Sequence, residues 1–167
     1  MSAPYTTRPA TVADARAIAE FQTETWNEAY AGLVRADYLE RITVEVRLAR
    51  WGGRLEAADR QILLAEQEGR VVAVTSFGPR RDAFDGPALE LMSIYLAAEA
   101  RGTGLADRLV AETIGDSDAV VWVFEQNARA IAFYRRHGFE PDGATTFDTD
   151  TGLPEIRMSR VSGLAGR

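Results

Sequence analysis

The chain has 167 residues, of which 46% are hydrophobic and 26% are charged, which fits one globular domain with a single core. It contains no cysteine and one histidine, His137, which excludes disulfides, cysteine nucleophiles and multi-histidine metal sites. The net charge of −6 argues against nucleic-acid binding, which usually needs a basic surface. No apolar run approaches the roughly 20 residues of a membrane span, and no signal-peptide pattern opens the chain. We therefore expect a cytoplasmic protein without nucleic-acid or membrane partners.

The first quarter of the chain predicts a strand, a helix and a loop. Residues 5–8 have a strand pattern that ends at Pro9. Thr11 is a helix N-cap candidate with Asp14 three residues later, so a helix should follow. Residues 30–42 resemble a loop.

The remainder alternates strands with helices. A second helix should begin after Thr43 and weaken at Gly52-Gly53. Apolar β-type runs follow at residues 61–66, 70–77, 89–96 and 119–124, and two more strands lie within 144–161. An amphipathic helix spans 127–137 and is closed by Gly138. This order predicts an α/β (α+β) fold in one domain, residues 1–167, with a mixed sheet flanked by helices.

A glycine-rich turn follows the strand at 89–96. Arg101-Gly102-Thr103-Gly104 leads from it into a helix that begins near Leu105. Such a turn exposes unpaired backbone N–H groups at a helix N-terminus, which suits a pyrophosphate. Two glycines can also be simple turn chemistry. A dinucleotide site is disfavoured because Asp107 stands where its fingerprint needs a third glycine, and a P-loop because no glycine precedes Lys-Ser or Lys-Thr.

The turn resembles the Q/R-x-x-G-x-G/A motif of the GNAT superfamily of N-acetyltransferases, in which backbone amides hold the pyrophosphate of coenzyme A. The resemblance implies acetyl-CoA as the acyl donor, bound at Arg101, Gly102, Thr103, Gly104, Leu105 and Ala106. Residues 127–139 resemble the family's N-x-x-A-x-x-F-Y-x-x-x-G-F segment. By this match Asn127 contacts the cofactor region and Tyr134 points at its sulfur. Residues 8–33 also resemble a bacterial branch, so the likeness covers about Thr7 to Val161.

The resemblance implies a GNAT fold, with a mostly antiparallel sheet of about seven strands and about four helices. It implies direct attack of an amine on acetyl-CoA in a ternary complex, without a metal. A backbone N–H near Ile94, Tyr95 or Leu96 would bind the thioester oxygen, and Tyr134 would protonate the leaving thiolate.

Glu90 is the predicted general base, since the family carries a glutamate on this strand. Strand alternation places Glu90 with Met92 and Ile94 on one face, among apolar neighbours. Glu90 can equally be a solvated residue at the strand end. Asn127 is also a helix N-cap, and His137 suits the helix C-terminus better than catalysis.

The acceptor is an unidentified amine: small polyamines, amino acids, antibiotics, peptide N-termini and protein lysines all fit. Its candidate contacts are four aromatic residues that can equally be core residues, namely Trp26, Tyr30, Tyr38 and Phe77. A different class of function, a non-catalytic coenzyme A-binding sensor or interaction domain, keeps the same glycine turn. The strand-rich tail could also pair across the two-fold axis of a homodimer.

Overall fold

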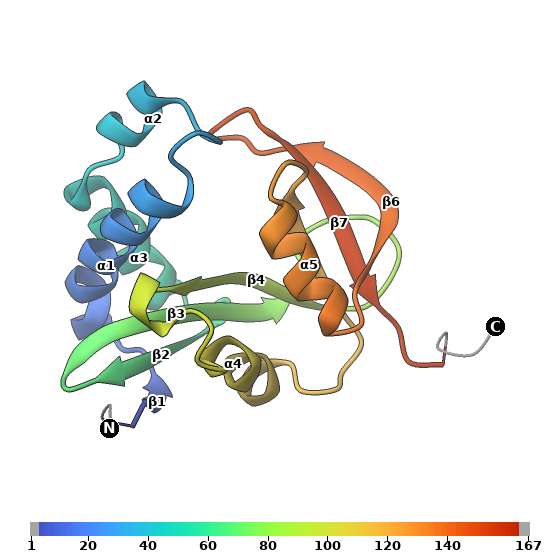
Figure 1. Cartoon of the computed structure of the whole chain (residues 1–167), viewed down its shortest axis with the longest axis horizontal. Helices are drawn as coiled ribbons and strands as arrows, with labels where there is room; N and C mark the ends of the chain where they lie inside the picture. Colours follow the sequence, from blue (N-terminus) through green and yellow to red (C-terminus); the bar gives the residue numbers. More distant parts are fainter. Residues whose placement is uncertain (1–3, 164–167) are drawn as a thin grey trace.

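The fold is built on a seven-stranded sheet in the order β1-β2-β3-β4-β5-β7-β6 (Figure 1). The computed structural model describes residues 4–163. The strands are β1 (Thr6–Pro9), β2 (Gln61–Gln67), β3 (Arg70–Pro79), β4 (Leu89–Leu96), β5 (Ala119–Phe124), β6 (Glu140–Phe147) and β7 (Pro154–Arg160). All neighbouring strands are antiparallel except the parallel pair β4 and β5. The predicted mixed, mostly antiparallel sheet is confirmed.

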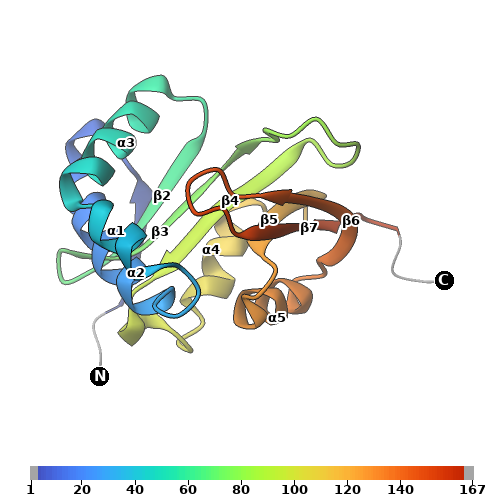
Figure 2. The same ribbon diagram turned by 90° about the horizontal axis from the view of Figure 1, so that it is seen from above.

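Helices cover both faces of the sheet (Figures 1 and 2). They are α1 (Ala15–Ala29), α2 (Ala36–Arg41), α3 (Val44–Ala57), α4 (Leu105–Thr113) and α5 (Ala128–Arg136). On one face, α1 and α3 pack on β2 and β3 through Ile18, Trp51, Leu64 and Val74. On the other face, α4 and α5 pack on β4 and β5 through a second core that includes Val110, Tyr134, Leu91 and Val121. None of the helices in residues 4–163 has the length and apolarity that crossing a bilayer requires.

Two helical features differ from the sequence prediction. The expected loop at 30–42 contains α2, whose Tyr38 is buried. The second predicted helix does begin after the N-cap Thr43, but α3 continues through Gly52 and Gly53 to Ala57. Two glycines weaken a helix by only about 1 kcal/mol each, and burial of Trp51 against the sheet offsets that cost.

The parallel strands β4 and β5 touch only near their beginnings. Their one paired position is Glu90 with Val120, so the strands separate toward their carboxyl ends. A β-bulge also breaks β4, because Phe77 pairs with Leu91 while the preceding Ser76 pairs with Ser93. The predicted alternation is therefore wrong beyond the bulge: Glu90 and Ile94 do not share a face, since Ile94 packs against the α4 and α5 side.

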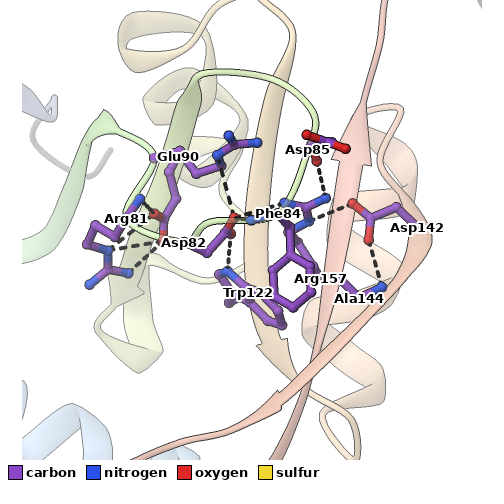
Figure 3. A network of polar contacts seen from close by, with 10 residues as sticks. Arg81, Asp82, Phe84, Asp85, Glu90, Trp122, Asp142, Ala144 and Arg157 are labelled. Atoms are coloured by element: carbon purple, nitrogen blue, oxygen red, sulfur yellow. Dashed lines mark hydrogen bonds and ion pairs between the residues drawn. The ribbon is translucent and has the colours of Figure 1, made fainter.

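A polar network centred on the buried Arg157 of β7 holds together the half of the sheet that contains β5, β6 and β7 (Figure 3). Its guanidinium donates to Asp142 at 2.7 Å, to Asp82 at 3.1 Å and to the carbonyl of Asp85 at 2.6 Å. Asp82 also accepts a hydrogen bond from the Trp122 indole at 2.9 Å. The network fixes the segment between β3 and β4 against β5, β6 and β7.

We expect Arg157→Leu to lower the free energy of unfolding by about 3–5 kcal/mol, because it leaves Asp142 without its arginine and Asp82 with only the longer contact to Arg80, at 3.5 Å. Those side chains are only 13% (Asp82) and 17% (Asp142) exposed. Urea unfolding followed by circular dichroism measures the change. Arg35→Leu is the matched control: its pair with Asp37 is 83% and 54% exposed, so the loss should stay below about 1 kcal/mol. Equal losses in both variants would contradict the assigned role of the network.

Candidate active site

A cleft of about 1030 Å³ opens where β4 and β5 separate. One half of it is lined by the glycine turn, the start of α4 and one side of α5. The other half is lined by α1, α3, the start of β7 and the turn between β6 and β7. Most of the predicted site residues line this cleft: Trp26, Tyr30, Tyr38, Glu90, Ile94, Tyr95, Leu96, Arg101, Gly102, Gly104, Ala106, Asn127 and Tyr134.

The glycine turn holds its backbone open toward the cleft. Gly102 and Gly104 have φ of 73° and 87°, a region that favours glycine, and Gly104 is the N-cap of α4. A Cβ at either position would meet nothing within 4 Å. The Thr103 hydroxyl donates to the Ala100 carbonyl at 2.7 Å, and Leu105 is buried in the core. The turn is thus anchored through Thr103, whose hydroxyl also accepts from the Leu105 amide at 3.4 Å. The amides of Gly102 and Gly104 lie at the N-terminus of α4, a position that favours an anion.

Tyr134 and Asn127 reach the cleft from the α5 region. The Tyr134 ring is buried and packs edge-on against Phe139, with centroids 5.9 Å apart. Burial, and secondarily the neighbouring Tyr95, raise the pKa of Tyr134, so its phenol stays protonated at neutral pH. The Asn127 side chain accepts from the Ala130 amide at 3.1 Å, so it is the helix N-cap that the sequence predicts.

Aromatic rings form much of the opposite half. Tyr30 lies against Trp26 with ring centroids 4.3 Å apart, and edge-on to Phe124 at 5.6 Å. Tyr38 also lines this half. Phe77 does not: the register that pairs it with Leu91 turns it to the other face, where it packs against the α4 and α5 core. The structure therefore gives Phe77 no place among the cleft-lining residues.

Glu90 lies in the cleft wall, but its surroundings differ from those expected (Figure 3). The side chain is completely buried. Arg81 donates to it from the guanidinium at 2.6 Å and from the backbone amide at 3.0 Å, and these contacts engage both carboxylate oxygens. The expected apolar neighbourhood is wrong because the β3–β4 connection brings an arginine over the strand.

Glu155, at the start of β7, is a cleft residue that the sequence analysis missed. It pairs with Phe124, the last residue of β5, and so lies where the strands separate. Burial, and then the charge of Asp148, raise the pKa of Glu155 to about 7; Arg81 opposes this rise, and Glu90 adds a smaller contribution to it. A carboxyl group poised near neutrality in a cleft is suited to proton transfer. No local pattern announces it, because its position depends on the pairing of β5 with β7.

An ion pair joins two of the elements that line the cleft, α3 and the β6–β7 turn. Arg50 of α3 contacts Asp150 of the β6–β7 turn at 3.0 Å, and both residues line the cleft. His137 lies away from the lining, at the C-cap of α5, where it contacts Asp107 at 2.8 Å. Within residues 4–163 no group of three or more histidine or acidic side chains is arranged to hold a metal ion.

Comparison with known proteins agrees with this architecture. The model of the acetyltransferase (GNAT) family matches residues 16–139. The uncharacterized N-acetyltransferase YuaI of Bacillus subtilis (strain 168) is 29% identical over 166 residues, covering 90% of this chain and 94% of YuaI. The crystal structure of PaiA N-acetyltransferase from Thermoplasma acidophilum, in complex with coenzyme A, aligns with a TM-score of 0.69 at 20% identity, covering 94% and 98% of the two chains. The structure of yncA from Salmonella typhimurium with acetyl-CoA aligns with a TM-score of 0.64 at 24% identity, covering 94% and 93%.

The seven-stranded sheet has two parallel strands that separate, and the glycine turn lines the cleft between them. This is the architecture of an acyl-coenzyme A-dependent transferase. The chain belongs to the acetyltransferase (GNAT) family, and it is an acetyl-CoA-dependent N-acetyltransferase.

Proposed function

We propose that the chain transfers the acetyl group directly to an amine while acetyl-CoA and the amine occupy the two halves of one cleft. The observation that carries this proposal is the continuity of the cleft, which runs from the open amides at Gly102 and Gly104 to the aromatic wall and Glu155. Arg101, Ala106 and Asn127 line the half assigned to the cofactor. Acetyl-CoA supplies a thioester whose carbonyl carbon bonds to the amine nitrogen as the C–S bond breaks.

Proton removal from the amine is assigned to a carboxylate. An alkyl amine with a pKa near 10.4 is almost entirely protonated at pH 7, so a base is needed. Glu90 remains the base predicted from the sequence. We favour Glu155, because Arg81 engages both oxygens of Glu90 and Glu155 has a pKa of about 7. Glu155 would accept the proton that the nitrogen loses as the amide forms.

Proton delivery to the leaving sulfur is assigned to Tyr134. Its phenol is protonated at neutral pH and faces the same cleft. The sulfur gains the proton that Tyr134 gives up, and a proton from solvent then restores the Tyr134 phenol. A backbone N–H at the end of β4, at Ile94, Tyr95 or Leu96, would donate to the thioester oxygen as charge develops there.

Tyr134→Phe should lower kcat by about 10²–10⁴-fold, the range for loss of a general acid. Its affinity for acetyl-CoA should stay unchanged. Thiol release from acetyl-CoA over a panel of amines measures turnover, and the cysteine-free protein adds no thiol signal. Calorimetry measures the affinity. Full turnover in the variant would refute the role of Tyr134.

The same assay separates the enzyme from a non-catalytic coenzyme A sensor, since a sensor binds acetyl-CoA but releases no thiol with any amine. Turnover by the wild type with at least one amine, at a rate proportional to enzyme, supports the proposed function. Binding without turnover over the whole panel would favour the sensor.

A further inference from the structure

The acceptor half of the cleft is rich in arginine although the chain carries a net charge of −6. Three arginines, Arg47, Arg50 and Arg54, recur at helical spacing along α3 and line the cleft. Arg60 and Arg81 complete this positive wall. These arginines make the α3 side of the cleft positive, although the chain as a whole is acidic.

Three of the five arginines are neutralised by the chain itself. Arg50 contacts Asp150 at 3.0 Å, Arg60 contacts Asp59 at 2.9 Å and Arg81 contacts Glu90 at 2.6 Å. Their positive charges therefore already have internal partners.

Arg47 and Arg54 are the other two, and neither has a carboxylate partner among residues 4–163. Arg47 is only 3% exposed and donates to two neutral oxygens, the Thr23 hydroxyl at 3.1 Å and the Ile42 carbonyl at 2.6 Å. The Arg54 guanidinium lies over the Trp51 ring, 4.9 Å from its centroid. Desolvation lowers the pKa of both groups; Tyr95 opposes this lowering, and nearby arginines add to it by a smaller amount. Their guanidinium groups contact different parts of the wall, Ile42 and Trp51 respectively, so each is a separate desolvated cation that an incoming anion would stabilise.

A hydrogen-bond donor without an acceptor lies beside Arg47. The Trp26 indole nitrogen is buried and has no hydrogen-bond acceptor among the described residues. The Tyr95 hydroxyl approaches the Trp26 indole closely enough for Trp26 to oppose the raised pKa of Tyr95, but it does not meet hydrogen-bond geometry. The two ring centroids lie 6.3 Å apart. The Arg47 guanidinium lies 5.9 Å from the centre of the same Trp26 ring. A buried donor next to an arginine without a carboxylate partner suits an incoming acceptor of hydrogen bonds, and an anion satisfies both groups.

The opposite wall carries the complementary charge. Glu155 and Asp148 line the cleft from the β7 side. Asp148 accepts from the amide and the hydroxyl of Thr151, each at 2.7 Å, and its charge contributes to the raised pKa of Glu155. The acceptor half is therefore positive along α3 and negative near the start of β7.

We propose that the acceptor is a small zwitterion of the amino-acid class, with its carboxylate at Arg54 and its amine facing Glu155, while Arg47 adds to the positive charge of the same wall. This inference rests on the proposed acetyl transfer and adds the class of amine. The new C–N bond forms at the amine, the C–S bond of the thioester breaks, the amine proton passes to Glu155, and the carboxylate is unchanged. Arg54 holds the carboxylate end of the acceptor, which does not react, and this contact fixes the amine in position.

The test compares each free L-amino acid with its own primary amide in the thiol-release assay. The amide lacks the carboxylate charge, and its amine is less basic and more often neutral at pH 7. Faster reaction of the free acid therefore cannot come from amine reactivity. We expect at least one free amino acid to exceed its amide in kcat/KM by about 10- to 100-fold, the range for a charged hydrogen-bonded contact.

Arg54→Gln should reduce kcat/KM for that amino acid by about 10- to 100-fold and change the amide by less than about twofold. Arg16→Gln is the matched control, because it removes the same charge from α1 outside the cleft lining; it should alter neither substrate. An unchanged affinity for acetyl-CoA shows that the Arg54→Gln fold is intact.

Two outcomes would overturn the inference: amides reacting as fast as acids, or turnover restricted to amines without an anionic group, such as polyamines. Either result leaves acetyl transfer itself standing. Absence of turnover with every amine, by contrast, removes the proposed function along with this inference.

Discussion

Gly104→Glu is expected to weaken acetyl-CoA binding by at least about 100-fold, since juxtaposed like charges cost several kcal/mol and each 1.4 kcal/mol is tenfold in affinity. The open space beside Gly104, where a Cβ meets nothing within 4 Å, is the space that we assign to the pyrophosphate. A glutamate there brings both volume and negative charge. Calorimetric titration of acetyl-CoA into wild type and variant measures the loss.

Gly143→Glu is the matched control for backbone strain. Gly143 has a φ of 92°, close to the 87° of Gly104, and it also faces open space, but it lies in β6 away from the cleft lining. Both variants carry the cost of a side chain at positive φ, roughly 1–2 kcal/mol. Only Gly104→Glu should lose acetyl-CoA. If both variants bind normally, the glycine turn is not the cofactor site.

Glu155→Gln should lower kcat/KM at neutral pH by about 10²–10⁴-fold, the contribution of a general base. A base acts only when deprotonated, so wild-type activity should rise through about pH 7, where the Glu155 carboxyl loses its proton. This rise should be missing from the variant. Glu90→Gln is the other arm of the test: if it abolishes turnover while Glu155→Gln keeps both its rate and its pH profile, the base is Glu90.

The stability of Glu155→Gln distinguishes chemistry from misfolding. The carboxyl pKa is raised from 4.5 to about 7 on folding, so between these values the folded state holds more protons than the unfolded state. The free energy of unfolding contributed by this group therefore falls as pH rises through that window. A neutral glutamine removes this penalty. The variant should be at least as stable as wild type at pH 8; a large loss of stability there would show that Glu155 is structural.

The parts of the fold predicted well are those whose signals are local. Strands β2 and β3 are predicted from their own apolar runs, and Glu68 and Gly69, between them, both take positive φ in a tight turn. The glycine turn and the Asn127 cap likewise depend on residues that are neighbours in sequence. The run of α3 across its glycines was not readable, because the packing of Trp51 that compensates for them comes from strands later in the chain.

The catalytic side of the cleft was harder to predict for the same reason. Glu90 was found on its strand, but its partner Arg81 comes from a connection whose path no sequence pattern determines. Glu155 becomes notable only once β7 lies beside β5. The charges of Arg47 and Arg54 are ordinary on an isolated helix, and they stand out only once the fold shows that no carboxylate contacts either of them.

The Arg50–Asp150 contact between α3 and the β6–β7 turn has a consequence for the size of the acceptor. The bridge joins two elements that line the cleft, α3 and the β6–β7 turn, so an acceptor that runs between them has to part it. A partly exposed ion pair contributes only about 0.2–1 kcal/mol, so the bridge disfavours such an acceptor by no more than about fivefold in affinity.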